Sequence, residues 1–136
     1  MFNGEFNGEI VFAIADVEHL KVDFGTEIVP TKIVNKDDLV VLGRKAPKNI
    51  WLYKIAYGNE KEYLDSLENM INQLCSKAEY VNELVRTYEE VSIMIYVRSE
   101  FAEIGYGIPS HILKKLSLLD CSLNFSILSF GMAIDA

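Results

Sequence analysis

Three side chains that could bind a ligand or a partner alternate along one predicted strand. Tyr96, Arg98 and Glu100 are spaced two residues apart at the end of an apolar, β-branched run, so they would share one face of that strand. Arginine and tyrosine often anchor interfaces, and an arginine can hold an anionic group through two parallel hydrogen bonds. The competing interpretation is that Arg98 pairs with a neighbouring carboxylate and Tyr96 only covers the sheet.

Residues that could hold a metal or act as a nucleophile are few and scattered. The soft ligands are two histidines and two cysteines without the paired spacing of a metal site: His19, Cys75, His111 and Cys121. No nucleophile has a base and an orienting group near it in the sequence. We therefore expect no metal, no cofactor and no catalytic residue, and a protein that is not an enzyme. Both thiols are assigned to packing.

Charge and length restrict the class of protein further. The chain has 136 residues with 13 Lys+Arg and 20 Asp+Glu, which gives a formal net charge of −7. A nucleic-acid partner is not expected because such partners need a basic face. No apolar run reaches the ~18 residues that span a bilayer, and no basic, apolar leader opens the chain. We expect one domain, residues 1–136, located in the cytoplasm.

The elements that would position these side chains are mostly strands in the first half of the chain. In the segment 9–15, residues 10–15 form a continuous apolar run, which favours a central strand covered on both faces. A weak helix over 16–24 and a short strand over 39–42 follow, and residues 50–57 are rich in aromatic and β-branched types that suit a further strand.

The second half predicts helices and strands in alternation. Apolar residues at three- and four-residue steps predict one long helix over 60–88, with a mostly acidic opposite face. Residues 91–98 alternate as a strand, with Val91, Ile93, Ile95 and Val97 pointing away from Tyr96 and Arg98. A short helix after Pro109 and a strand over 122–127 complete the pattern.

This order predicts an α+β fold with a ferredoxin-like βαββαβ core and a largely antiparallel sheet, extended by a C-terminal helix and strand. In that plan the helices cover one face of the sheet. The other face is left for solvent, a second subunit or a partner.

The C-terminal third is similar to a known bacterial family. The resemblance lies in Ile-Tyr-Val-Arg-Ser at 95–99, Gly-Ile-Pro-Ser-His-Ile-Leu-Lys-Lys-Leu at 107–116 and Ser-Leu-Asn-Phe-Ser-Ile at 122–127. These runs resemble domain of unknown function 4279, with Ile108 and Asp120-Cys121 departing from the family at its caps. The resemblance implies a bacterial origin and supports the fold, and it supplies no activity.

Two functions follow from these observations. The first is a non-catalytic protein-interaction module. Its sharpest form is an immunity- or antitoxin-like protein that binds a basic protein partner through complementary charge. The alternative is a small-molecule-binding or enzymatic domain with an anion pocket near Arg98, between the sheet and the loop over 100–108. The candidate binding residues come from two strands: Trp51, Tyr53, Tyr96, Arg98 and Glu100. A homodimer that covers an aromatic patch on the sheet face is also expected.

Overall fold

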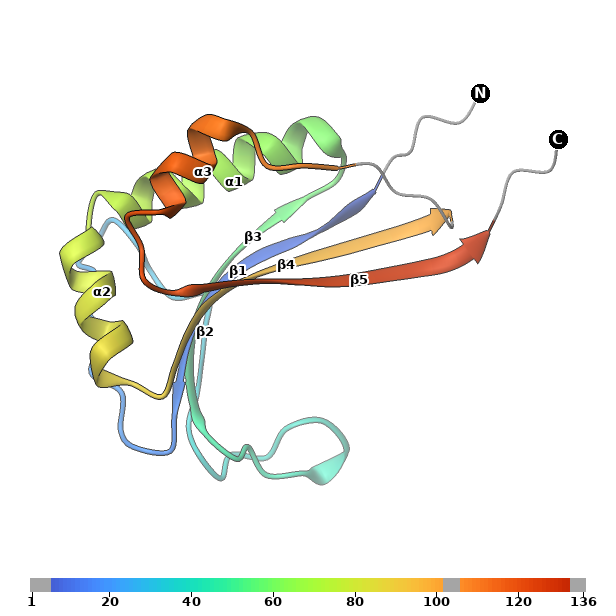
Figure 1. Ribbon diagram of the computed structural model, residues 1–136. Helices are drawn as coiled ribbons and strands as arrows, with labels where there is room; N and C mark the ends of the chain where they lie inside the picture. Colours follow the sequence, from blue (N-terminus) through green and yellow to red (C-terminus); the bar gives the residue numbers. More distant parts are fainter. Residues whose placement is uncertain (1–5, 102–105, 133–136) are drawn as a thin grey trace, which may run out of the picture.

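The computed structural model describes residues 6–101 and 106–132, which form a five-stranded mixed sheet and three α-helices. The helices gather on one side of the sheet, and the sheet bends around its other, open face (Figure 1). The elements in chain order are β1 (Asn7–Asp16), β2 (Lys32–Val34), the 3₁₀ turn η1 (Val41–Gly43), β3 (Asn49–Tyr57), α1 (Glu60–Cys75), α2 (Ala78–Thr87), β4 (Glu90–Phe101), α3 (Ser110–Leu116) and β5 (Ser122–Met132).

The strand order is β2-β3-β1-β4-β5, with β1 in the centre. Three of the four pairings between these strands are antiparallel, and the fourth joins β4 to β5 in parallel. The chain passes from β4 to β5 through α3, as a parallel pair requires a crossover. The α+β class and the C-terminal helix and strand are therefore confirmed.

The expected helix over residues 16–24 is wrong, so the helix between the first two strands of the ferredoxin-like plan is missing. This segment is bends and extended chain. Its backbone is bonded to distant side chains instead: the Lys21 amide donates to the Tyr88 hydroxyl at 2.7 Å, and the Asp23 amide donates to the Tyr80 hydroxyl at 2.9 Å. Because α2 and the residue that follows it supply these acceptors, the segment has partners without forming a helix.

The expected strand over residues 39–42 is also wrong. These apolar residues are exposed, and the segment forms an isolated bridge and the turn η1. Leu42 has a φ of 62°, in the left-handed region that extended strands do not use. The short strand lies earlier instead, at β2, where it pairs with residues 50–52 of β3.

The apolar stripe of the predicted long helix is confirmed, but the helix is broken. It is divided at Ser76 and Lys77 into α1 and α2. The amides of these two residues donate to Asn72 and Leu74 carbonyls, which closes the end of α1. The stripe crosses the break and stays buried in both parts: Tyr63, Leu67, Met70, Ile71, Leu74, Val81 and Leu84.

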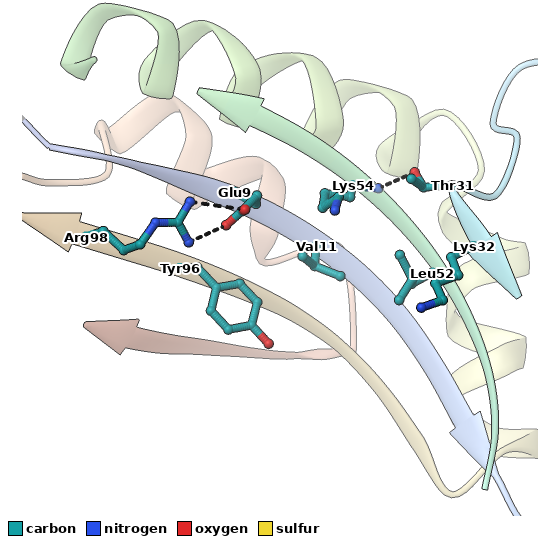
Figure 2. A pocket seen from close by; sticks show the side chains of 8 residues that line it. All are labelled: Glu9, Val11, Thr31, Lys32, Leu52, Lys54, Tyr96 and Arg98. Atoms are coloured by element: carbon teal, nitrogen blue, oxygen red, sulfur yellow. Dashed lines mark hydrogen bonds and ion pairs between the residues drawn. The ribbon is translucent and has the colours of Figure 1, made fainter. Parts of the chain in front are cut away.

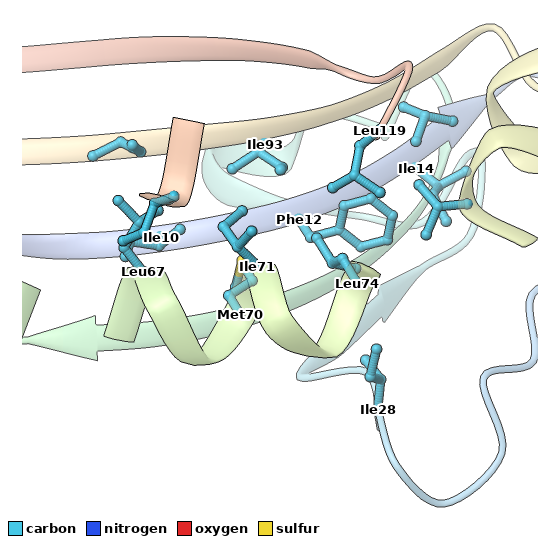
Figure 3. Close-up of a cluster of buried hydrophobic side chains, with 14 of the residues drawn as sticks. Ile10, Phe12, Ile14, Ile28, Leu67, Met70, Ile71, Leu74, Ile93 and Leu119 are labelled. Carbon is cyan, nitrogen blue, oxygen red and sulfur yellow. The ribbon is translucent and has the colours of Figure 1, made fainter. Parts of the chain in front are cut away.

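Strand β1 is central but is covered on one face only, which corrects the expectation for residues 9–15. Ile10, Phe12 and Ile14 are fully buried against the helices, as Figure 3 shows. The alternate residues Val11 and Ala13 are half-buried on the open face. The core therefore lies between the sheet and the helices, and the open face is available for binding.

Candidate functional site

The register of the sheet decides which side chains share the open face. Directly opposed residues in antiparallel strands point to the same side. Glu9 of β1 lies opposite Tyr96 of β4, and Val11 lies between Met94 of β4 and Lys54 of β3. These five residues therefore form the centre of the open face.

The predicted binding residues are divided between the two faces. Tyr96 and Arg98 share the open face, as their alternation predicts, whereas Glu100 is exposed beyond the part of β4 that pairs with β1, where the pairing with β5 is irregular. Trp51 lies opposite Ile14 and is buried on the helix side, and Tyr53 lies on the same side and donates its hydroxyl to Gln73 of α1 at 2.8 Å. The two β3 aromatics thus cannot line one pocket with the β4 residues.

A hollow of about 600 Å³ opens on the face that carries Tyr96 and Arg98 (Figure 2). It extends across four strands and the residue before β2. Its lining consists of Glu9, Val11, Thr31, Lys32, Leu52, Lys54, Tyr96 and Arg98. Part of the 100–108 loop, next to which the anion pocket was expected, lies outside the described residues.

Arg98 holds a protein carboxylate in this hollow. Its two terminal nitrogens donate to the two oxygens of Glu9 at 2.9 and 3.1 Å, and Nε donates to Asn7 Oδ1 at 3.3 Å. The hydrogen bonds from Arg98 hold the pKa of Glu9 below its usual value, and the same pair raises the pKa of Arg98. This is the arrangement of the competing interpretation, in which the guanidinium pairs with a neighbouring carboxylate.

The positive charge available to a ligand comes from two lysines instead. Lys32 and Lys54 line the hollow and are exposed, and neither forms an ion pair within the described part of the chain. The backbone amide of Lys54 donates to Thr31 Oγ1 at 2.9 Å, which ties β3 to the residue before β2 at this point. The hollow thus has ammonium groups that can approach an anion without first losing a partner.

An apolar floor lies between the charged groups. Val11 and Leu52 line the middle of the hollow, and the Tyr96 ring, which is 38% exposed, lies beside them. In Figure 2, Val11 lies between the Glu9–Arg98 pair and Lys32, with Tyr96 beside the pair and Leu52 beside Lys32. A ligand could therefore place an apolar body on this floor and an anionic group near the lysines.

The backbone of Tyr96 is fixed from the helix side by another tyrosine. The Tyr57 hydroxyl donates to the Tyr96 carbonyl oxygen, and this bond passes over β1 at Gly8. Burial raises the pKa of Tyr57, so the hydroxyl stays protonated as the donor. The strand that carries Tyr96 and Arg98 is thereby held in place from the core.

The histidine and cysteine side chains take other positions. His111 Nε2 lies 2.6 Å from a carboxylate oxygen of Glu68, and Cys75 Sγ lies 3.3 Å from the Lys115 carbonyl oxygen. Burial raises the pKa of Cys121 to about 11, so its thiol stays protonated at neutral pH. Across the described residues, no group of three or more His, Cys, Asp or Glu side chains could hold a metal ion.

Sequence reasoning missed Glu9, Lys32 and Lys54 as site residues. Lys54 interrupts an apolar strand run with a charge and Glu9 directly precedes one, which is the signal that could have identified them. Their meeting across β1 and β3 depends on the register, which a single sequence does not give.

Comparisons with known proteins give one match. A family model described as "Domain of unknown function (DUF4279)" matches residues 9–130. No curated protein and no solved structure matches the chain. Within residues 6–101 and 106–132, no helix has the length and apolar character needed to cross a membrane.

Proposed function

The chain belongs to the DUF4279 family, and we propose that it is a binding protein whose open sheet face holds a small anionic ligand with an apolar body. The observation that carries the proposal is a cationic hollow on an acidic protein. Three cationic side chains and one carboxylate line the hollow, whereas the chain as a whole has a net charge of −7. A random surface of this protein would be acidic, so the local reversal of charge supports a role in binding an anion.

The lining also specifies what kind of anion fits. The Glu9 carboxylate is already held by Arg98, which leaves Lys32 and Lys54 as the groups for an anionic oxygen. Lysine ammonium groups act as mobile point charges and donate hydrogen bonds to carboxylate, sulfonate or phosphate oxygens alike. Val11, Leu52 and Tyr96 add an apolar surface, so affinity would come from an amphipathic anion rather than from an inorganic one.

The chemistry of the lining supports binding rather than catalysis. No histidine or cysteine is among the described residues that line the hollow, and its carboxylate is engaged by Arg98. Acid–base catalysis needs a group poised to exchange a proton with the substrate. The proposed ligand is therefore held and released without being transformed.

The test uses 8-anilinonaphthalene-1-sulfonate, an apolar anion whose fluorescence rises when it leaves water. We expect the wild type to bind the probe, and Lys32→Gln/Lys54→Gln to bind it at least about tenfold more weakly, because each lost charge contact contributes on the order of 1 kcal/mol. The matched control is Lys36→Gln/Lys61→Gln, which removes two exposed charges away from the hollow and should leave binding unchanged. Equal binding by both double variants would remove the hollow as the site.

A second candidate function uses the opposite side of the molecule. Exposed acidic residues follow one another along α1 and α2: Glu60, Glu62, Asp65, Glu79 and Glu83. This face would fit a basic protein partner, and an immunity- or antitoxin-like role is its sharpest form. Fluorescence anisotropy with a labelled lysine-rich peptide tests it: Glu79→Lys should weaken binding more than Glu18→Lys, and equal losses would refute a specific face.

The setting of either function stays a prediction. The described thiols Cys75 and Cys121 are free, which fits a reducing compartment such as the cytoplasm. The family resemblance implies a bacterial source.

A further inference from the structure

Strand β5 forms one edge of the sheet. It pairs with β4 on one side, and within the described residues no strand lies on its other side. The C-terminal parts of β4 and β5 extend past the helices in Figure 1. An edge strand of this length offers backbone hydrogen-bonding groups along which another strand can pair.

Two usual protections of an edge strand, charged residues and proline, are missing from β5. Natural edges are blunted with lysine or other charges, or with proline. Residues 121–134 contain no charged residue and no proline, and this is the longest uncharged stretch of the chain. With 24% charged residues in the whole chain, a stretch of this length would contain about three of them on average, so the uncharged edge departs from the composition of the protein.

Large apolar side chains are exposed along the same strand. Phe125 is 43%, Ile127 is 53% and Leu128 is 52% exposed, and the alternation of the strand places Leu128 on the opposite face from the other two. A strand with apolar residues exposed on both faces is suited to becoming an interior strand of a larger sheet.

We propose that β5 pairs antiparallel with β5 of a second copy of this chain, across a two-fold axis at Ile127. In this register Ile127 faces its own copy, Phe125 lies opposite Ser129, and Ser126 lies opposite Leu128. Phe125 and Leu128 each meet a serine, and Leu123 lies opposite Gly131, so the two strands can approach without pairing these large side chains with one another. The two five-stranded sheets become one continuous sheet.

Charge explains why the second copy joins at this strand. Two copies with a net charge of −7 each repel one another over most of their surfaces. The uncharged stretch over residues 121–134 lets identical strands meet without opposing like charges. Strand β5 lines no part of the hollow on the open face, so a result that refutes the dimer leaves the proposed ligand site untouched, and the reverse also holds.

The test is sedimentation equilibrium of the wild type and of Ile127→Lys at concentrations up to about 100 μM. The wild type should sediment as twice the 15.4 kDa chain mass at the upper concentrations. Ile127→Lys places two lysines against each other at the axis and should raise the dissociation constant at least about tenfold. Because this variant lowers the net negative charge, weaker association could not be attributed to general repulsion.

The matched control is Val41→Lys, which makes the same change at a side chain that is 79% exposed in the loop after β2 and should leave the dimer intact. A monomeric wild type would overturn the proposal, and so would a dimer that Ile127→Lys does not weaken. If Ile127→Lys fails to fold, hydrogen exchange of the wild type decides instead. Amides of β5 should exchange more slowly at high than at low protein concentration, and exchange independent of concentration would refute the pairing.

Discussion

Replacement of Gly8 by alanine should destabilise the protein strongly, although it adds only one methyl group. A Cβ at Gly8 would overlap the carbonyl oxygen of Tyr96 and would lie 2.6 Å from the Tyr57 hydroxyl oxygen. The first obstacle is backbone of β4, which cannot turn away as a side chain would. The new methyl group therefore either separates β1 from β4 or displaces Tyr57.

The cost can be worked out from those two consequences. Overpacking in a well-packed core costs about 1–3 kcal/mol. A buried hydroxyl that loses its acceptor costs about 1–3 kcal/mol more, and Tyr57 is buried with its hydroxyl bonded to Tyr96. We therefore expect Gly8→Ala to lower the free energy of unfolding by about 2–6 kcal/mol.

Urea denaturation followed by the fluorescence of Trp51, the single tryptophan, measures this loss. Gly107→Ala is the control because a Cβ there has nothing within 4 Å, and it should stay within about 0.5 kcal/mol of the wild type. Tyr57→Phe should cost about 1 kcal/mol alone and less in the Gly8→Ala background, where the hydroxyl has already lost its bond. A Gly8→Ala loss under about 1 kcal/mol, or strictly additive losses in the double variant, would refute the reasoning.

Three further predictions concern the helices and the core. Leu67→Ala should lower the free energy of unfolding by about 2–5 kcal/mol because its side chain is fully buried, whereas Leu42→Ala, in an exposed turn, should change it little. Equal losses for the two variants in urea denaturation would contradict the burial of Leu67 on α1. Asn59→Ala should cost about 1 kcal/mol, since the Asn59 side chain caps α1 by accepting from the Glu62 amide at 2.9 Å, and an unchanged midpoint would contradict the cap. Burial raises the pKa of Tyr63 from 10.0 to about 12, so this group's contribution is intact below pH 10 and is lost as pH rises towards 12; alkaline titration of stability should be flatter in Tyr63→Phe, and an identical slope would argue against burial as the cause.

The elements best predicted from the sequence are those whose burial repeats regularly. In β4, Val91, Ile93, Ile95 and Val97 are buried and their neighbours face outward, as the alternation predicts. The stripe of the long helix was equally predictable, but its break was not. A two-residue turn at Ser76 and Lys77 keeps the next apolar residue at a helical step, so periodicity does not detect it.

The segment after β1 could not be predicted for a different reason. Its amides at Lys21 and Asp23 depend on tyrosine hydroxyls that lie 67 and 57 residues further along the chain. Local spacing of apolar residues favours a helix there, and it contains no information about hydrogen-bond partners so far away in the sequence.

The candidate site was predictable only in its β4 part. Alternation predicts that Tyr96, Arg98 and Glu100 share one face of the strand, and the order of the elements predicts that one face of the sheet is free of helices. Whether Trp51 or Leu52 joins them depends on the register between β1 and β3, and a shift of one residue exchanges the two faces. The pairing of Glu9 with Arg98, which leaves the two lysines as the unpaired charges of the site, follows from the register between β1 and β4.

The central position of β1 also has a consequence for synthesis on the ribosome. Strand β1 pairs with β4 so that Asn7 meets Arg98, and these residues are 91 positions apart. At about 5–20 residues per second, the ribosome needs roughly 5–20 s to supply that partner after β1 has been made. During this interval one edge of the apolar run at residues 10–15 has no strand beside it. The nascent chain is therefore most exposed to misassociation before β4 emerges, and mutations that slow elongation between α1 and β4 would prolong that interval.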